Sequence, residues 1–116
     1  MAAYPDKPIR FVVPAAAGGG ADATVRIVAT ALAQRLGQPI VIDNKPGAAG
    51  AIGLDAIAKA SADGYTIGTA NLSNFTVASN VAKSLPYNPS RDFPPIAMFI
   101  TQPYLLGAHR VYQSSL

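Results

Sequence analysis

Two glycine-rich segments are the part of this sequence best suited to bind a small anion. They are Gly18-Gly19-Gly20 and Gly47-Ala48-Ala49-Gly50, and each lies between an apolar run and the start of an expected helix. Backbone N–H groups at a helix N-terminus bind anions when no bulky side chain stands in the way. Two such loops side by side could hold both oxygens of one carboxylate. Glycines also serve tight turns and close packing of helices on sheets, and this purely structural interpretation is the alternative.

Asp22 follows the first glycine segment and is expected at the start of the helix that comes next. Aspartate is a preferred N-cap residue, because its side-chain oxygen accepts a backbone N–H of the first turn. We therefore expect Asp22 to cap this helix first and to orient a ligand second. Asn caps nearly as well, so Asp22→Asn should keep most of the stability, and unfolding would indicate a buried charged network instead.

The first glycine segment also satisfies a loose dinucleotide-binding pattern. Residues 18–23 read G-G-G-A-D-A, which matches G-x-G-x-x-G/A, and Asp43 stands where an acid could bind a ribose hydroxyl. Four residues, Pro14-Ala15-Ala16-Ala17, separate the preceding strand from the first glycine, whereas a dinucleotide-binding turn enters its glycines almost directly. A dinucleotide-binding enzyme domain therefore ranks below carboxylate binding.

The residue types present argue against several other kinds of site. The 116 residues include no Cys, no Glu and one His, His109, so neither a disulfide nor a zinc–thiolate site can form and no metal-ligand cluster stands out. No G-x-S-x-G motif exposes a nucleophilic serine. The nine Lys and Arg residues are scattered and the net charge is only +3, which does not favour nucleic acid. We expect no catalytic residues, metal, cofactor or nucleic-acid partner.

Apolar runs and helical spacings alternate along the chain, which is long enough for one domain over residues 1–116. The expected strands cover residues 9–13, 39–42, 65–68, 96–100 and 104–106, and the expected helices cover 22–36, 51–60 and 76–83. Parallel neighbours need a crossover helix, so this order predicts an α/β fold with a Rossmann-like, mostly parallel sheet flanked by helices. Ligands bind outside the carboxyl ends of such strands, where both glycine segments should lie.

Six blocks of sequence, in register over about residues 4–106, resemble the Bug-type periplasmic receptors of tripartite tricarboxylate transporters. The blocks are KPIRFVVP with GGGAD (7–14 and 18–22), LGQPIVIDNKPGAAG (36–50), AKA (58–60), DGYT (63–66), LPYNP (85–89) and RDF (91–93). The resemblance implies part of one lobe of a type II periplasmic binding protein. Such a receptor captures small organic carboxylates, whether dicarboxylates, tricarboxylates or aromatic acids, and delivers them to membrane transporter subunits. It also implies a periplasmic location, although residues 1–4 carry no export signal.

The resemblance further implies which residues contact the ligand. Backbone amides and small polar groups of both glycine loops would do so, joined by polar side chains of the loop after the third strand. The expected ligand-binding residues are Ala16, Ala17, Gly18, Gly19, Gly20, Asp22, Ala48, Ala49, Gly50, Asn71, Ser73 and Asn74.

Length is the main departure from the family, whose members are longer and complete their first lobe with chain that returns after the second. We therefore expect the N-terminal portion of lobe 1, as a truncated product or a fragment, with residues 107–116 as a divergent tail. An unpaired sheet edge beside apolar residues 96–106 predicts a homo-oligomer, by default two-fold, that buries over ~1,000 Å². A domain that oligomerises and no longer binds solute is the alternative.

Overall fold

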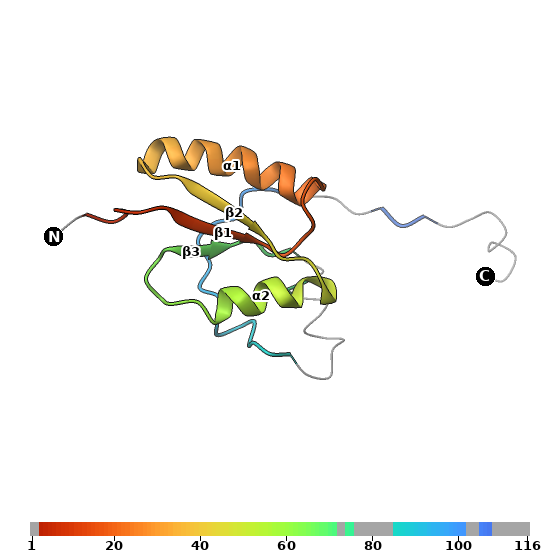
Figure 1. Cartoon of the computed structure of the whole chain (residues 1–116). Coiled ribbons are helices and arrows are strands. Elements are labelled where there is room, and N and C mark those ends of the chain that lie inside the picture. Colours follow the sequence, from red (N-terminus) through yellow and green to blue (C-terminus); the bar gives the residue numbers. More distant parts are fainter. Residues whose placement is uncertain (1–2, 72–73, 76–84, 102–104, 108–116) are drawn as a thin grey trace, which may run out of the picture.

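A computed structural model describes residues 3–71, 74–75, 85–101 and 105–107 of the chain. Its elements are β1 (Ile9–Val13), α1 (Gly20–Leu36), β2 (Ile40–Asn44), the short 3-10 turn η1 (Ala48–Gly50), α2 (Ala51–Ala58) and β3 (Thr66–Gly68). The strands form a parallel sheet in the order β2-β1-β3, with α1 and α2 on opposite sides of it (Figure 1). The predicted α/β class and the parallel sheet are confirmed.

The central strand β1 is covered on both faces, which explains why four of its five residues are apolar. Phe11 and Val13 form one buried cluster with Val25 of α1, against which Ile40 and Ile42 of β2 pack. Val12 is likewise fully buried, and Leu54 of α2 is only 1% exposed. The core therefore lies on either side of β1 and fixes both helices relative to the carboxyl ends of the strands.

Helix α1 ends where the sequence predicts but begins earlier. Gly37 adopts the left-handed conformation (φ 72°) and its N–H donates to Ala33 O, a C-terminal cap that favours glycine. At the other end the N-cap is Gly19, and Asp22 lies within the first turn. The expected N-cap role of Asp22 is therefore wrong, because its side chain is engaged elsewhere.

The predicted strand at 96–100 is absent. These residues are described, yet they belong to no sheet, and Ile96 and Met98 are each 83% exposed. Apolar residues favour a strand only where a neighbouring strand can pair with them. Of the predicted strand at 104–106, residues 105 and 106 are exposed and outside any sheet, and residue 104 lies outside the described residues, as does the predicted helix at 76–83.

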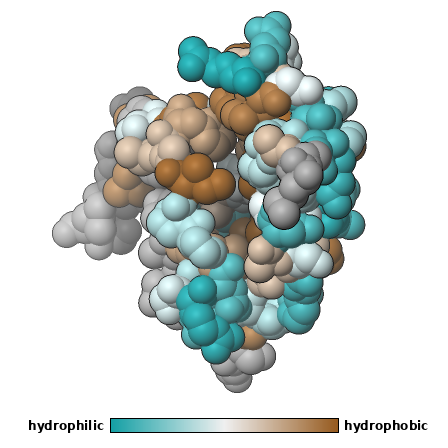
Figure 2. Space-filling model, turned by 90° about the vertical axis from the view of Figure 1, so that its left-hand side faces the viewer, coloured by the Kyte–Doolittle hydropathy of each residue, from teal (hydrophilic) through white to brown (hydrophobic). Residues whose placement is uncertain are grey.

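An aromatic contact ties the start of the chain to the turn before β3. The Tyr4 hydroxyl donates to Gly64 O (2.5 Å), and the Tyr65 hydroxyl donates to an Asp6 carboxylate oxygen (2.5 Å) while accepting the Asp6 N–H (2.9 Å). The rings of Tyr4 and Tyr65 meet edge to face, with centroids 5.0 Å apart. Figure 2 views this end of the molecule, where hydrophilic and apolar residues are mixed over the surface. The contact holds the start of the chain against the turn at the amino end of β3.

Candidate functional site

Both glycine loops lie at the carboxyl edge of the sheet. β1 and β2 pair in parallel from Ile9 opposite Ile40 to Val13 opposite Asn44, so the two strands end side by side. The first loop follows β1 and the second follows β2. The Lys45 N–H donates to Val13 O (2.8 Å), which continues the pairing up to the loops. Both glycine segments thus lie at the edge of the sheet where the sequence predicts them.

The buried carboxylate of Asp22 joins three segments at this edge. One oxygen, Oδ2, accepts the Gly18 N–H (3.0 Å) and the Arg26 Nε–H (2.9 Å), and Oδ1 accepts the side-chain amide of Asn44 (3.0 Å). The same amide contacts Ala15 O at 3.3 Å. These hydrogen bonds, that from Arg26 foremost, lower the pKa of the Asp22 carboxyl group to about 2. Asp22 is therefore a buried, charged residue at the centre of a hydrogen-bond network.

Two of the backbone N–H groups expected to face a ligand are used within the chain. Gly18 donates to Asp22, and the Gly50 N–H donates to Gly47 O (3.0 Å). By contrast, the first backbone bond of α1 runs from the Ala23 N–H to Gly19 O, and among the described residues no side chain caps this helix. The N–H groups of residues 19–21 precede that bond, and these three residues are exposed.

The second loop has positive φ angles at four consecutive residues. The φ angles are 115° at Gly47, 51° at Ala48, 56° at Ala49 and 93° at Gly50. An alanine in this region is strained by roughly 1–2 kcal/mol, and such strain concentrates at ligand-binding sites. A Cβ at Gly50 would lie 2.6 Å from Asn74 Cβ, so this glycine also permits close contact with the third loop.

The third loop contacts the second through Asn74, next to Gly50. Asn74 is only 5% exposed. Its side-chain oxygen accepts the Asn71 N–H (2.8 Å), and the Asn74 N–H donates to the side-chain oxygen of Asn71 (3.0 Å). The Tyr87 hydroxyl donates to Asn74 O at 3.3 Å. Ser73, also expected at the site, lies outside the described residues.

The expected residues thus divide into two groups by burial. Asp22, Gly50 and Asn74 are buried and connect the loops, whereas the remaining described residues are exposed. The exposed group contains Ala16, Ala17, Gly18, Gly19, Gly20, Ala48, Ala49 and Asn71. Sequence reasoning missed Arg26 and Asn44. The i, i+4 spacing of Arg26 from Asp22 was a readable signal, but the contact of Asn44 depends on strand register.

Three charged side chains form a cluster, the charged group, near the end of β2. Arg10 Nη2 lies 2.7 Å from Asp43 Oδ2, and Lys45 Nζ lies 3.8 Å from the same oxygen. Two cations therefore share one carboxylate beside the second glycine loop.

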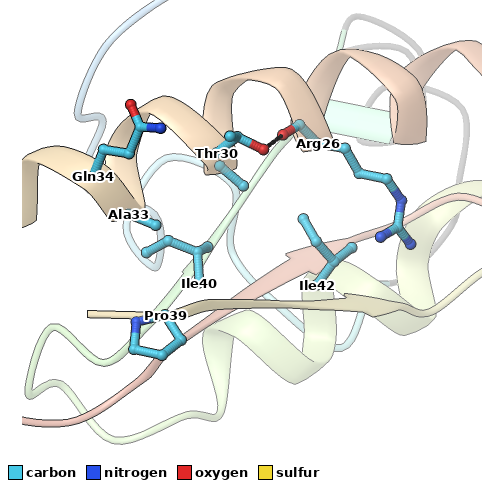
Figure 3. A pocket seen from close by; sticks show the side chains of 8 residues that line it. Arg26, Thr30, Ala33, Gln34, Pro39, Ile40 and Ile42 are labelled. Atoms are coloured by element: carbon cyan, nitrogen blue, oxygen red, sulfur yellow. Dashed lines mark hydrogen bonds between the residues drawn. The ribbon is translucent and has the colours of Figure 1, made fainter. Parts of the chain in front are cut away.

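Two hollows border these elements. A groove of about 560 Å³ runs between α1 and β2, where Ile40 and Ile42 face the helix and Arg26 lies at the end nearer the start of α1 (Figure 3). A larger cavity, of about 1200 Å³, lies among β3, α2 and residues 92–101, and Gly20, Ala21 and Asn74 line it too. The larger cavity therefore reaches the candidate site.

Within the described residues, no three His, Cys, Asp or Glu side chains are grouped so that they could hold a metal ion. The helices described there are too short or too polar to cross a membrane.

Comparison with known proteins identifies the family. Residues 24–111 match the family model of the tripartite tricarboxylate transporter family receptor, TctC. The chain is 41% identical to a UPF0065 protein of Bordetella bronchiseptica over 90% of its own length, and 40% identical to the protein BugT of Bordetella pertussis over 89%. It spans only 31% and 32% of those two relatives.

A solved structure of similar fold is that of MatC (Rpa3494) from Rhodopseudomonas palustris with bound malate. It is 35% identical, with a TM-score of 0.73, and the similarity covers 77% of this chain and 30% of MatC. The family match extends over more than half of the chain, and the curated relatives and this fold agree with it. The chain therefore belongs to the receptor family of the tripartite tricarboxylate transporters.

Proposed function

We propose that this chain is the N-terminal portion of the first lobe of a periplasmic receptor, which captures small organic carboxylates and delivers them to a membrane transporter. The observation that carries the proposal is that the two glycine loops follow neighbouring strands at the carboxyl edge, beside the start of α1, which no described side chain caps. The family match and the malate bound to MatC support a carboxylate ligand. A dinucleotide enzyme has no comparable support.

In this proposal one carboxylate group of the ligand accepts hydrogen bonds from the N–H groups of Gly19, Gly20 and Ala21. Charge-assisted bonds to backbone amides are strong, and the positive end of the α1 dipole adds to them. The strained turn at Ala48 and Ala49 supplies further amides from the second loop. Asn71, Ser73 and Asn74 of the third loop then orient the rest of the ligand.

Binding and release would leave the ligand chemically unchanged, because the role of a receptor is capture. The chain spans about a third of the length of the curated relatives, so the remaining ligand contacts of a longer receptor would come from other residues. We therefore expect this chain alone to bind dicarboxylates weakly. Enclosure by a second lobe would strengthen the binding.

The test is an NMR titration of the 15N-labelled chain with malate, succinate, citrate and benzoate. The amides of Gly19, Gly20, Ala21, Ala48 and Ala49 should shift with at least one of these anions. Malamide, the uncharged diamide of malate, is the matched control and should leave them unchanged. Shifts confined to other parts of the chain, or equal shifts with malamide, would contradict the proposed site.

We also propose that the chain forms a homo-oligomer, which is the basis of the alternative, non-binding function. Ile96, Met98, Leu105 and Leu106 are at least 83% exposed, and exposed apolar segments recruit other chains. Sedimentation at micromolar concentration should detect a dimer or larger species, and Ile96→Lys with Met98→Lys should dissociate it. A monomer in the unsubstituted chain would contradict this proposal and leave the carboxylate site unaffected.

A further inference from the structure

Three hydrogen-bond donors from three separate segments converge on the Asp22 carboxylate. The Gly18 N–H comes from the loop after β1, the Arg26 Nε–H from the next turn of α1, and the Asn44 amide from the end of β2. The Asn44 amide in addition contacts Ala15 O at the start of the first loop. One buried side chain therefore connects the first glycine loop to the strand that leads into the second.

Only a carboxylate satisfies all three donors at this place. Its two oxygens both accept hydrogen bonds, whereas the amide of an asparagine offers one accepting oxygen and one donating nitrogen. With asparagine at position 22, the nitrogen would face the N–H of Gly18 and Arg26, or the amide of Asn44. At least one partly buried hydrogen bond of this network would then be lost, which is costly.

The same geometry excludes Asp22 from direct contact with a bound anion. Its side chain is only 5% exposed, and each of its oxygens already accepts a hydrogen bond. Arg26 at 2.9 Å offsets its negative charge, which would otherwise repel a carboxylate nearby. Asp22 therefore lies buried beneath the first glycine loop, whereas residues 19–21 lie on the exposed side of it.

We propose that Asp22 is a positioning residue, which anchors the first glycine loop to the end of β2 by hydrogen bonds (this anchoring is called the fastening below). It thereby sets the distance between the two glycine loops that, in the proposed function, bind the carboxylate. The inference rests on the proposed function for its effect on binding. The fastening itself is a property of the ligand-free chain and is measurable without any ligand.

The experiment compares Asp22→Asn, Asn44→Ala and the double variant with the unsubstituted chain. Asp63→Asn is the matched control, because Asp63 also accepts a backbone N–H, that of Tyr65 at 3.0 Å, but in the turn before β3. Circular dichroism monitors folding, amide hydrogen exchange reports on Gly18 without ligand, and the malate titration reports on affinity.

Asp22→Asn should weaken malate binding about tenfold and speed exchange of the Gly18 amide by a similar factor, as expected for a lost bond to a charged group. Asn44→Ala should act in the same direction. The double variant should bind no worse than Asp22→Asn, because both substitutions break one connection. Asp63→Asn should stay within about twofold of the unsubstituted chain, since its bond lies away from the loops.

Two outcomes would overturn the positioning role when Asp22→Asn folds, and a third is given below. In the first, Asp22→Asn is folded and both binds malate and exchanges Gly18 like the unsubstituted chain. In the second, the losses of the two single variants multiply in the double variant. If Asp22→Asn fails to fold, Asn44→Ala decides, because it leaves the charged pair intact and should still speed exchange at Gly18.

A chain that binds no malate contradicts the proposed function alone. The exchange measurement still decides the fastening in that case, and an unchanged Gly18 amide in Asn44→Ala is the third outcome against it.

Discussion

Replacing Gly53 by alanine should destabilise this protein, although alanine is the better helix former. Gly53 lies within α2, where an added Cβ would be 2.7 Å from Pro14 Cβ, 2.8 Å from Pro14 Cα and 3.0 Å from Lys45 O. Pro14 directly follows β1 and Lys45 directly follows β2. Because two of these atoms belong to the backbone, no side-chain rotation relieves the contact and α2 must move outward.

Two opposite contributions set the size of the effect. Alanine gains about 1 kcal/mol over glycine in a helix interior. Overpacking a close contact loses about 1–3 kcal/mol, and backbone contacts favour the upper end of that range. The free energy of unfolding should therefore fall by about 1–2 kcal/mol overall. Residues 48–50 lead directly into α2, so the proposed malate binding should weaken too.

Urea unfolding followed by circular dichroism measures the change, with the midpoint reporting stability and the slope reporting the surface exposed. Gly20→Ala is the matched control, since an added Cβ there has no atom within 4 Å and the position lies in the first turn of α1. It should leave the stability unchanged or raise it slightly. A Gly53→Ala protein as stable as the unsubstituted chain, with an equal slope, would refute the close-contact argument.

Three further outcomes are expected. Leu54→Ala removes a side chain that is 1% exposed and should lower the free energy of unfolding by about 2–5 kcal/mol, whereas Ile52→Ala, at a position 54% exposed, should change it far less in the same urea experiment. Because the folded-state pKa of Asp22 is lowered from 3.8 to about 2, its contribution to stability is complete above pH 3.8 and lost as the pH falls towards 2; thermal midpoints between pH 5 and 2 should fall less steeply in Asp22→Asn. Ala49→Gly relieves a positive φ and should raise the thermal midpoint, and a fall would contradict the left-handed turn.

Much of the fold follows from local patterns in the sequence. The run Ile9–Val13 is apolar at nearly every position, which is typical of a central parallel strand, and Gly37 stops α1 as its type and place predict. Once three strands alternate with two helices, parallel pairing follows, and with it the placement of both glycine loops on one edge. The family resemblance pointed to the same loops.

The contacts that depend on strand register could not be read from the sequence. Asn44 meets Asp22 because β2 ends level with β1, and no pattern within either segment contains that information. The start of α1 differs from the prediction for a related reason. The propensity of Asp22 to cap a helix competes with a hydrogen-bond network that only the tertiary structure creates. The segment 96–100 has the residues of a strand but no neighbouring strand in the described part of the chain.

The charged group at the end of β2 has a consequence for kinetics. Arg10 and Lys45 share the single carboxylate of Asp43, so these three residues carry one net positive charge beside the second loop. That charge attracts an approaching dianion over a distance of about 8 Å at physiological ionic strength and further in dilute buffer. The association rate of the proposed dicarboxylate ligand should therefore fall as salt is added. Lys45→Gln should flatten that dependence, while the dissociation rate changes little.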